Sequence, residues 1–334
     1  MKPYFRAIYS TLSAEALTTL VAEKYKLENI QCRFLTRGVG DTYLVQSPNE
    51  QFILRIYRDT HRSLPQIKEE LSLLLALKDA GVSVSWPIQD HSGTHIQPLQ
   101  AIEGIRHAVL FSYAPGTAVS MLNDQQLRNF GREMARFHNV SSALSPKTSR
   151  WSFDTETTLF KPLRLLQTVK TQDPETYAWL QQTAQRAQEK LSQTDTSGFS
   201  IGYCHFDFIP KNFHFDGDAV TLFDFDFMGY GWLVNDIMSF WQHLMFDVYA
   251  GRVTQQASDD AYTVFLEGYR EHRAVSEHEL AMAPYLTLGF WLFYMGFHTT
   301  HDHFYTFTQP AYVKMFTGFL KHVVNTWWDK EENQ

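Results

Sequence analysis

Cysteine is scarce in this chain of 334 residues, with only Cys32 and Cys204, far apart and outside any Cys-x-x-Cys motif. This scarcity excludes a disulfide framework and a thiolate zinc site, and it favours reduced thiols and a cytoplasmic location. Long apolar runs are lacking too. The most apolar stretch, residues 285–297, is too short to cross a bilayer and is predicted to form a buried helix. The first 26 residues lack the apolar centre of a secretory signal.

An excess of positive charge is also absent. The chain has 29 Lys and Arg against 36 Asp and Glu, which gives a net charge of -7. This balance argues against nucleic acid or an anionic membrane as a partner, whereas a cationic substrate is compatible with it. Hydrophobic residues make up 44% of the chain and aromatic residues 15%. The length and the apolar content together predict a large core divided between two lobes.

The sequence has no internal repeat, so the lobe boundary is inferred from a change of pattern near residue 113. Before it lie three β-type runs, 42–47, 51–57 and 108–113, with Pro48-Asn49 as a hairpin signal. After it, helical patterns dominate. We therefore expect an α+β fold with a small β-sheet N-terminal lobe and a larger, mainly helical C-terminal lobe, divided as 1–113 and 114–334.

A helix is predicted over residues 65–80, where Ser63 can cap, Pro65 fits the first turn and Gly81 follows the end. Its apolar stripe includes the position of Glu70, whereas Glu69 is expected to point the other way. An inward carboxylate needs a partner, and Arg55 in the strand 51–57 is the obvious candidate. From these spacings alone, both could equally be unrelated surface charges.

The segment 204–226 carries most of the chemistry. An Asp-Gly pair at 216–217 separates two alternating runs and predicts a hairpin, whose strands would lie about 4.8 Å apart. Asn212 and Asp224 would then flank the same end of the hairpin, with Asp207 on the loop that enters it. Oxygen ligands of this kind suit magnesium that carries nucleotide phosphates. Asp207 would be left to orient a hydroxyl and accept its proton during phosphoryl transfer.

The pattern His205-x-Asp207, then Asn212, a hairpin and Asp224-x-Asp226 resembles the aminoglycoside phosphotransferase and choline kinase superfamily, whose members are relatives of the protein kinases. Other segments fit this resemblance in the same order along the chain. They are a small-residue loop at 37–43, the strand with Arg55, the helix with Glu70, a hinge at 110–116 and a helix at 130–138. The resemblance covers about residues 30–300.

The resemblance implies a bilobal protein-kinase-like fold that uses ATP and Mg²⁺ to move the γ-phosphate to a hydroxyl of a small molecule. The acceptor would be an amino alcohol, a sugar or an aminoglycoside-like compound. It makes Asp207 the catalytic base and assigns magnesium to Asn212 and Asp224. The nucleotide would be held by Gly38, Gly40, Arg55, Glu70, Ser112, Tyr113 and Ala114, and the site supported by His205, Asp226 and Asp236.

The sequence departs from the common pattern of the superfamily at three positions. Arg55 stands where protein kinases have Lys. The planar guanidinium group of Arg therefore replaces the compact ammonium group of Lys. Phe206 replaces a frequent Gly before the base, and Lys211 replaces a Gly before Asn212. Lys211 could contact phosphate, although the solvated interpretation is favoured.

The His-rich segment 298–303 could bind a metal by composition, but it has no His-Glu-x-x-His pattern and follows an apolar helix. We expect it to border the substrate site instead. Two other functions stay open. Residues 222–240 are also similar to a bacterial stress-response Ser/Thr protein kinase, with homoserine kinases a lesser candidate. A nucleotide-binding scaffold without catalysis is the third possibility, against which the intact Asp207, Asn212 and Asp224 count.

Overall fold

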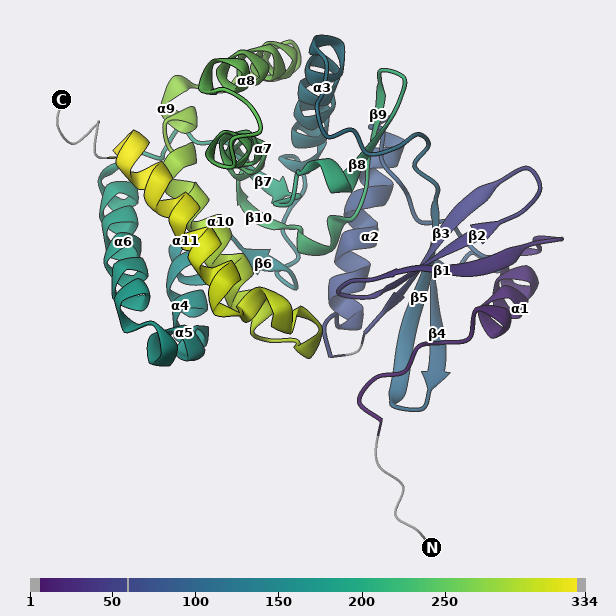
Figure 1. The fold of residues 1–334 in the computed structure, drawn as a ribbon. Helices are drawn as coiled ribbons and strands as arrows, with labels where there is room; N and C mark the ends of the chain where they lie inside the picture. The colour runs from purple at the N-terminus through teal and green to yellow at the C-terminus, as the bar shows by residue number, and fades with distance from the viewer. Residues whose placement is uncertain (1–6, 59, 329–334) are drawn as a thin grey trace, which may run out of the picture. The chain divides into compact units, whose positions relative to one another are not determined.

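The computed structural model describes residues 7–58 and 60–328. The chain divides into two compact units, which are described separately. The first comprises Met1–Gly116 and Thr221–Asp226, and the second Thr117–Val220 and Phe227–Gln334. Figure 1 shows a sheet in the N-terminal part of the chain and mostly helices in the remainder, as the sequence predicts. Among the described residues, no helix is both long and apolar enough to span a membrane.

The first unit is built on a five-stranded antiparallel sheet. Its strand order is β1-β2-β3-β5-β4, with bounds Gln31–Arg37, Asp41–Gln46, Gln51–Tyr57, Gly104–Ser112 and Ile96–Ala101. The predicted strands and their hairpin at Pro48-Asn49 are confirmed. Helix α1 (Ala14–Tyr25) contributes Leu17 and Val21 to a core formed with the sheet. Apolar side chains on alternate strand positions, such as Leu54 and Ile56, fill this core because they share one face of β3.

Helix α2 (Leu64–Asp79) begins as predicted, with Ser63 and Gln66 forming a capping box and Pro65 in the first turn. Glu70 is buried, at 1% exposed, as its place in the apolar stripe requires. Glu69, which is expected to point away from that stripe, is buried as well, at 3% exposed. Helix α2 therefore buries more than one stripe, and helical periodicity finds only the most apolar one.

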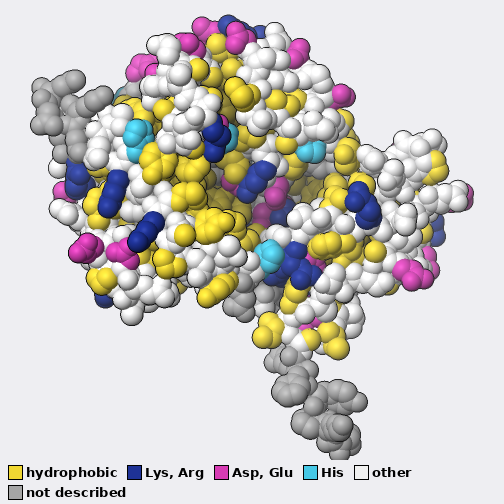
Figure 2. All heavy atoms as spheres, in the orientation of Figure 1, with side chains coloured by type: hydrophobic (Ala, Val, Ile, Leu, Met, Phe, Trp, Pro, Cys, Tyr) yellow, Lys and Arg dark blue, Asp and Glu magenta, His cyan; other side chains and the backbone are white. Residues whose placement is uncertain are grey.

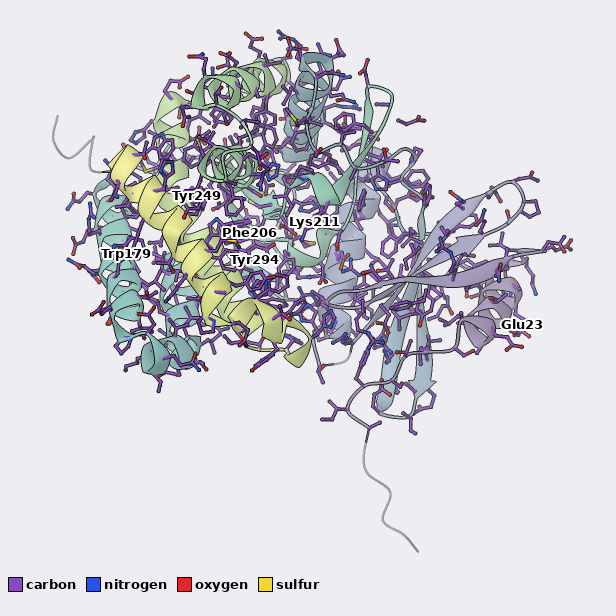
Figure 3. The ribbon with its side chains drawn as sticks, in the orientation of Figure 1. Glu23, Trp179, Phe206, Lys211, Tyr249 and Tyr294 are labelled. Carbon is purple, nitrogen blue, oxygen red and sulfur yellow. The ribbon has the colours of Figure 1, made fainter. Side chains whose placement is uncertain are left out.

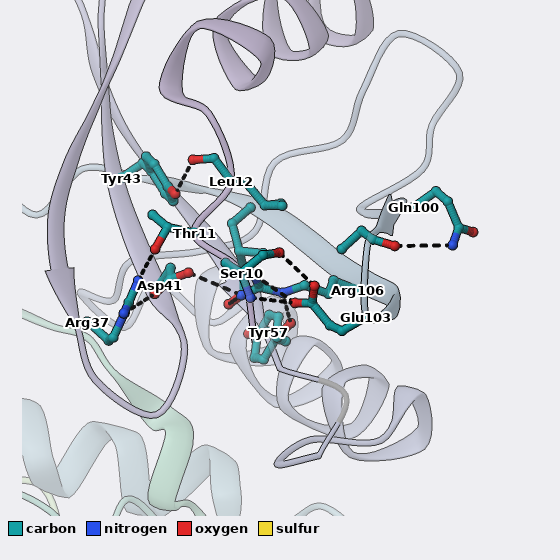
Figure 4. Close-up of polar contacts among 12 residues, drawn as sticks. Ser10, Thr11, Leu12, Arg37, Asp41, Tyr43, Tyr57, Gln100, Glu103 and Arg106 are labelled. Atoms are coloured by element: carbon teal, nitrogen blue, oxygen red, sulfur yellow. Dashed lines mark hydrogen bonds and ion pairs between the residues drawn. The ribbon is translucent and has the colours of Figure 1, made fainter. Parts of the chain in front are cut away.

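A buried arginine ties the N-terminal segment to the sheet. Arg106 in β5 is 1% exposed. Its guanidinium donates to the carbonyl of Ser10 at 2.9 Å, to that of Tyr57 at 3.3 Å and to Asp41 Oδ2 at 3.3 Å (Figure 4). Because a buried charge is costly without partners, these contacts fix the segment before α1 against β2 and β3.

The second unit is mainly helical. A three-stranded sheet in the order β6-β10-β7 and the two-stranded β8–β9 sheet complete it. Its strands are β6 (Trp151–Ser152), β7 (Ile201–Cys204), β8 (Phe213–Asp216), β9 (Ala219–Leu222) and β10 (Gly229–Trp232). Its α-helices are α3 (Asp124–Ser141), α4 (Lys161–Leu165), α5 (Gln167–Gln172), α6 (Pro174–Gln193), α7 (Val234–Tyr249), α8 (Gln255–Arg270), α9 (Glu277–Leu280), α10 (Ala283–His298) and α11 (Pro310–Val323).

Helices α3 and α8 approach so closely that only glycine fits at two points. A Cβ on Gly131 would lie 2.1 Å from the carbonyl oxygen of Phe265, and one on Gly268 would lie 2.2 Å from that of Arg128. Helix α10 coincides with the predicted apolar helix and is buried over most of its length. On the face drawn in Figure 2, hydrophobic side chains gather over α10 and α11.

The hairpin β8–β9 is also confirmed, with Gly217 at a φ of 59° in its turn. Glycine adopts this left-handed conformation without steric cost. Within β9 the chain passes from the second unit, which includes Val220, to the short segment Thr221–Asp226 of the first, and it returns at Phe227. Sequence patterns give no sign of this exchange.

Candidate active site

The loop that follows β7 holds Asp207 in a fixed position. Its carboxylate is buried, at 3% exposed. The Asn212 side-chain amide donates to Asp207 Oδ2 at 2.7 Å and to the Asp207 carbonyl at 2.8 Å. Lys211 Nζ lies 3.3 Å from the same Oδ2, although the Lys211 side chain is 63% exposed. Lys211 is thus both solvated and paired with the expected base.

Asp236, in the first turn of α7, holds the backbone of this loop. Its carboxylate accepts hydrogen bonds from the main-chain N–H of His205 at 2.9 Å and of Phe206 at 2.6 Å. It also accepts from His138 Nε2 at 3.0 Å, and His138 Nδ1 lies 2.8 Å from the Tyr269 hydroxyl. Burial lowers the pKa of His138 despite the Asp236 carboxylate, so the ring stays neutral at pH 7. Asp236 thus contacts the loop backbone at two points, and its role as a brace of the catalytic loop stays a prediction.

His205 and Phe206 shape the loop from within. The main-chain N–H of Asp207 donates to His205 Nδ1 at 3.2 Å, and the His205 ring stacks on Phe208. Phe206 has a φ of 67°, which explains why glycine is frequent at this position. Its ring stacks on Phe153 with the centroids 3.9 Å apart. This aromatic packing offsets the backbone strain.

The first unit assembles the other expected residues around Arg55. Arg55 Nη1 lies 2.8 Å from Asp224 Oδ1 and 3.9 Å from Glu70 Oε1, and Arg55 Nη2 lies 3.4 Å from Asp226 Oδ2. The pairing of Arg55 with Glu70 is thus present, at the long end of ion-pair distances. Of these three carboxylates, that of Asp224, the predicted magnesium ligand, lies nearest to Arg55.

Two residues near Asp226 are missing from the sequence-based site. Arg62 is 2% exposed, and it donates to Asp226 Oδ1 at 3.0 Å and to the Asp226 carbonyl at 2.5 Å. His61 Nε2 lies 3.3 Å from Asp226 Oδ2. Burial raises the pKa of Asp226, but the charges of Arg62 and Arg55 outweigh it and hold that pKa well below its usual value. No spacing pattern signals these contacts, because Arg62 and Asp226 are 164 residues apart.

The loop between β1 and β2 has the close backbone packing of a glycine loop. The Gly38 N–H donates to the Gly40 carbonyl at 2.9 Å, and a Cβ on Gly40 would lie 2.7 Å from the Ile56 carbonyl oxygen. At the expected hinge, the Ser112 N–H donates to the Trp86 carbonyl, and the Ser112 carbonyl accepts from Ser85 Oγ at 2.6 Å. Ser112 therefore ties the end of β5 to the segment of Ser85 and Trp86, and Tyr113 and Ala114 follow it.

The oxygen donors present fit a magnesium ion. Because Asn212 points its amide nitrogen at Asp207, its Oδ1 faces away and can serve as a ligand. Asp224 has a φ of 62°, and its side chain is 45% exposed. A carboxylate and an amide oxygen are ligands that Mg²⁺ accepts. Asn212 and Asp224 belong to different units, so their sharing of one ion stays a prediction.

The His-rich segment does not form a recognisable metal centre. Over the ranges that the structure describes, no group of three or more His, Cys, Asp or Glu side chains could hold a metal ion. The side chain of Asp302, one member of the segment, lies outside the described residues. His298 instead packs among aromatic rings, with its ring 4.8 Å from that of Phe307.

The sequence and the fold match known proteins. A family model, described as the phosphotransferase enzyme family, matches residues 31–277. The chain is 32% identical over 297 residues to an uncharacterized protein of Deinococcus radiodurans, covering 87% of this chain and 84% of that protein. It is 26% identical over 296 residues to amicoumacin kinase of Bacillus subtilis, covering 86% of each chain.

A solved structure of the amicoumacin kinase hAmiN, in complex with AMP-PNP, Ca²⁺ and Ami, has a similar fold. The TM-score is 0.71 at 20% identity, and the match covers 94% of each chain. This likeness confirms the α+β kinase-like fold expected from the sequence. The hAmiN complex contains an ATP analogue and a divalent ion.

Proposed function

The chain belongs to the phosphotransferase enzyme family, and from this premise we propose that it transfers the γ-phosphate of ATP to a hydroxyl of a small molecule in the presence of Mg²⁺. The resemblance to aminoglycoside phosphotransferases and choline kinases is confirmed at the level of the family. The observation that carries the finer proposal is the buried Asp207, held by Asn212 on a loop whose backbone is fixed by Asp236.

Asp207 is proposed as the catalytic base. Its Oδ2 lies 3.3 Å from Lys211 Nζ and also accepts from Asn212, so two contacts hold the carboxylate in one orientation. A carboxylate held in this way can accept the proton of an acceptor hydroxyl as the oxygen attacks phosphorus. His205 and Asp236 act through the loop backbone and are positioning residues. Because each accepts a hydrogen bond from a main-chain N–H of the loop, they fix the loop and do not move protons in this scheme.

Magnesium, when bound, would neutralise charge on the phosphates. Asn212 Oδ1 and the Asp224 carboxylate are its proposed ligands, each offering an oxygen from its own unit. Arg55, which is 13% exposed in its side chain, is the proposed phosphate contact of the first unit, with Glu70 and Asp226 holding its guanidinium. Gly38 and Gly40 would let the backbone approach the phosphates, and the hinge with Ser112, Tyr113 and Ala114 would receive adenine.

The acceptor class proposed here comprises amino alcohols, sugars and aminoglycoside-like compounds. Its support is the family and the relation to amicoumacin kinase, a small-molecule kinase by name. We also propose a cytoplasmic location, supported by Cys32 and Cys204, which are both buried and unpaired with each other.

The test is transfer of label from γ-labelled ATP in a host extract split into small-molecule and protein fractions. Asp207→Asn should lose transfer by about 10²-fold or more while it still binds nucleotide, because the proton acceptor is gone and the fold is kept. Asp218→Asn is the matched control, since Asp218 is an exposed carboxylate on the β8–β9 turn. Equal turnover by Asp207→Asn would remove that residue from the role of base.

The magnesium assignment has its own experiment. The thermal shift caused by Mg·ATP should be abolished in Asp224→Ala, and an undiminished shift would contradict the ligand role. In the labelling experiment, Asp207-dependent label in protein would favour a Ser/Thr protein kinase over the small-molecule enzyme. Label in neither fraction would favour a nucleotide-binding scaffold.

A further inference from the structure

One face of α10 connects the loop of Asp207 to a histidine. The ring of Phe206, which precedes Asp207, lies 5.5 Å from that of Phe290. Phe290 lies 4.8 Å from Tyr294, and Tyr294 lies 6.1 Å from His298. Residues four apart share a helix face, and at 1.5 Å per residue His298 lies about 12 Å along α10 from Phe290. Figure 3 labels Phe206 and Tyr294, the start and middle of this path.

One ring nitrogen of His298 has no hydrogen-bond partner among the described residues. This nitrogen is Nδ1, and it is buried. A buried polar group without a partner is costly, which makes such an atom a candidate for contact with a ligand. Burial and the charge of Lys211 lower the pKa of His298 to about 4, so the ring is neutral at pH 7. A neutral ring offers one donor and one acceptor nitrogen.

The surroundings of His298 are flat and apolar. Its ring stacks on Phe307, which is 38% exposed, and lies 5.6 Å from that of Phe304. We call His298, Phe304 and Phe307 the aromatic wall. Exposed ring faces of this kind attract planar apolar groups.

Lys211 connects the aromatic wall with the expected base. Of the described residues, Lys211 is the charged side chain that shifts the pKa of His298, and its Nζ is 3.3 Å from the Asp207 carboxylate. This contact brings the wall near the expected base.

On the basis of the phosphotransferase function proposed above, we propose that His298 binds the acceptor through its buried ring nitrogen and that the aromatic wall stacks on a flat apolar part of it. The acceptor is then a hydroxyl compound with a planar apolar group. This assignment narrows the proposed acceptor class to compounds with a planar group. It also gives the His-rich segment 298–303 a role in acceptor binding that needs no metal ion.

The experiment compares His298→Ala, His298→Asn and Phe307→Leu with the full-length parent. Asn places an amide atom near the position of Nδ1, so it should restore much of what Ala loses. Phe307→Leu keeps the side chain apolar but removes the flat face of the aromatic ring. His322→Ala is the matched control, because His322 lies on α11 and also has a buried ring nitrogen without a partner among the described residues.

Binding is measured by saturation-transfer NMR in the presence of Mg·AMP-PNP, so that it does not depend on catalysis. The probes are tyrosol and tyrosinol as planar alcohols, with homoserine and kanamycin for comparison. Tyrosol and tyrosinol should bind the parent more tightly than homoserine or kanamycin. Their Kd should rise about three- to tenfold in His298→Ala, as expected for one hydrogen bond, and recover in His298→Asn. His322→Ala should match the parent.

Unchanged Kd values in His298→Ala, tighter binding of kanamycin than of tyrosinol, or no binding of either planar alcohol would overturn the assignment. The same variants, assayed for phosphate transfer, should raise the acceptor KM while kcat and the KM for ATP stay within about twofold. If His298→Ala transferred phosphate with an unaltered acceptor KM, the role of the aromatic wall in acceptor binding would be refuted, but the phosphotransferase function would not. His298-dependent binding without any transfer would refute the phosphotransferase function alone.

Discussion

At the scale of single residues, Phe206 combines strain with strong packing. Its φ of 67° is a left-handed conformation that costs an L-residue about 1–2 kcal/mol. Two contacts offset this cost. Asp236 accepts the Phe206 N–H at 2.6 Å, and the ring is fully buried against Phe153. The conformation turns the chain directly before Asp207, so the strain lies where the base is placed.

Phe206→Gly and Phe206→Ala separate these two effects. Both remove a buried aromatic ring, and we expect Ala to lower the free energy of unfolding by about 3–5 kcal/mol. Gly should cost about 1 kcal/mol less than Ala, because it relieves the left-handed strain. Urea unfolding of both variants measures the difference. If Ala were the more stable replacement, the positive φ would not be a source of strain.

His298 should make stability depend on pH. Burial and the Lys211 charge hold its folded-state pKa at about 4, below the ordinary value of 6.5. The neutral ring therefore stabilises the fold fully above about pH 6.5, and this contribution is lost as the pH falls towards 4. Between pH 7 and 5.5, the parent should lose about 1 kcal/mol more than His298→Asn, which does not titrate.

Urea unfolding at the two pH values measures this difference, and each protein is its own reference at pH 7. The other histidines are common to both proteins and cancel in the comparison. Parallel losses in the parent and in His298→Asn would show that the ring is not held neutral.

The sequence predicts those site residues that lie within one short pattern. Asp207 and Asn212 meet because they are five positions apart on one loop. Arg55 and Glu70 meet because strand alternation places Arg55 on the face of β3 opposite Leu54 and Ile56, and helix periodicity turns Glu70 inward. Arg62 could not be found, because its partner Asp226 is reached only through the fold. Contacts between distant segments depend on tertiary packing, which local periodicity does not encode.

At the scale of elements, the sequence predicts best those strands and helices whose apolar pattern is strongest. Strand β3 has the predicted bounds Gln51–Tyr57, and α10 covers the predicted apolar helix. Helix α2 shows the limit, since Glu69 is buried on a face that looks polar in the sequence. The exact approach of α3 to α8 could not be predicted either. Gly131 and Gly268 carry no spacing signal that pairs them.

The approach of α3 to α8 gives a prediction for Gly131. A Cβ there would meet the Phe265 carbonyl oxygen at 2.1 Å, so Gly131→Ala must move one backbone. Overpacking of this kind costs about 1–3 kcal/mol, which we expect to exceed the gain in helix propensity of about 1 kcal/mol. Gly198→Ala is the control, since a Cβ there has no atom within 4 Å.

The measurement is the urea midpoint of both variants. Because α3 also carries His138, the partner of Asp236, Gly131→Ala should in addition reduce phosphate transfer. Equal urea midpoints for Gly131→Ala and Gly198→Ala would show that α3 and α8 can move apart without loss of stability.

At the scale of the whole molecule, the first unit is discontinuous in sequence. Its second segment, Thr221–Asp226, contributes Leu222, which is fully buried and bonded through its main chain to Ser83 and Ser85. The same segment contributes Asp226, the partner of the buried Arg62. Residues 1–116 alone therefore lack both an apolar side chain and a counter-charge that their fold requires.

We expect the fragment 1–116 to show no cooperative thermal transition. Leaving Arg62 without Asp226 costs about 3–5 kcal/mol, and an empty Leu222 site about 2–5 kcal/mol more, against a typical total stability of 5–15 kcal/mol. Joining residues 219–228 to its end through a flexible Gly-rich linker should restore the transition, because both contacts can form again. The same fusion with Asp226→Ala should restore it only in part. Circular dichroism melts compare the three proteins, and a cooperative melt of 1–116 alone, equal to that of the fusion, would show that the second segment is dispensable to the first unit.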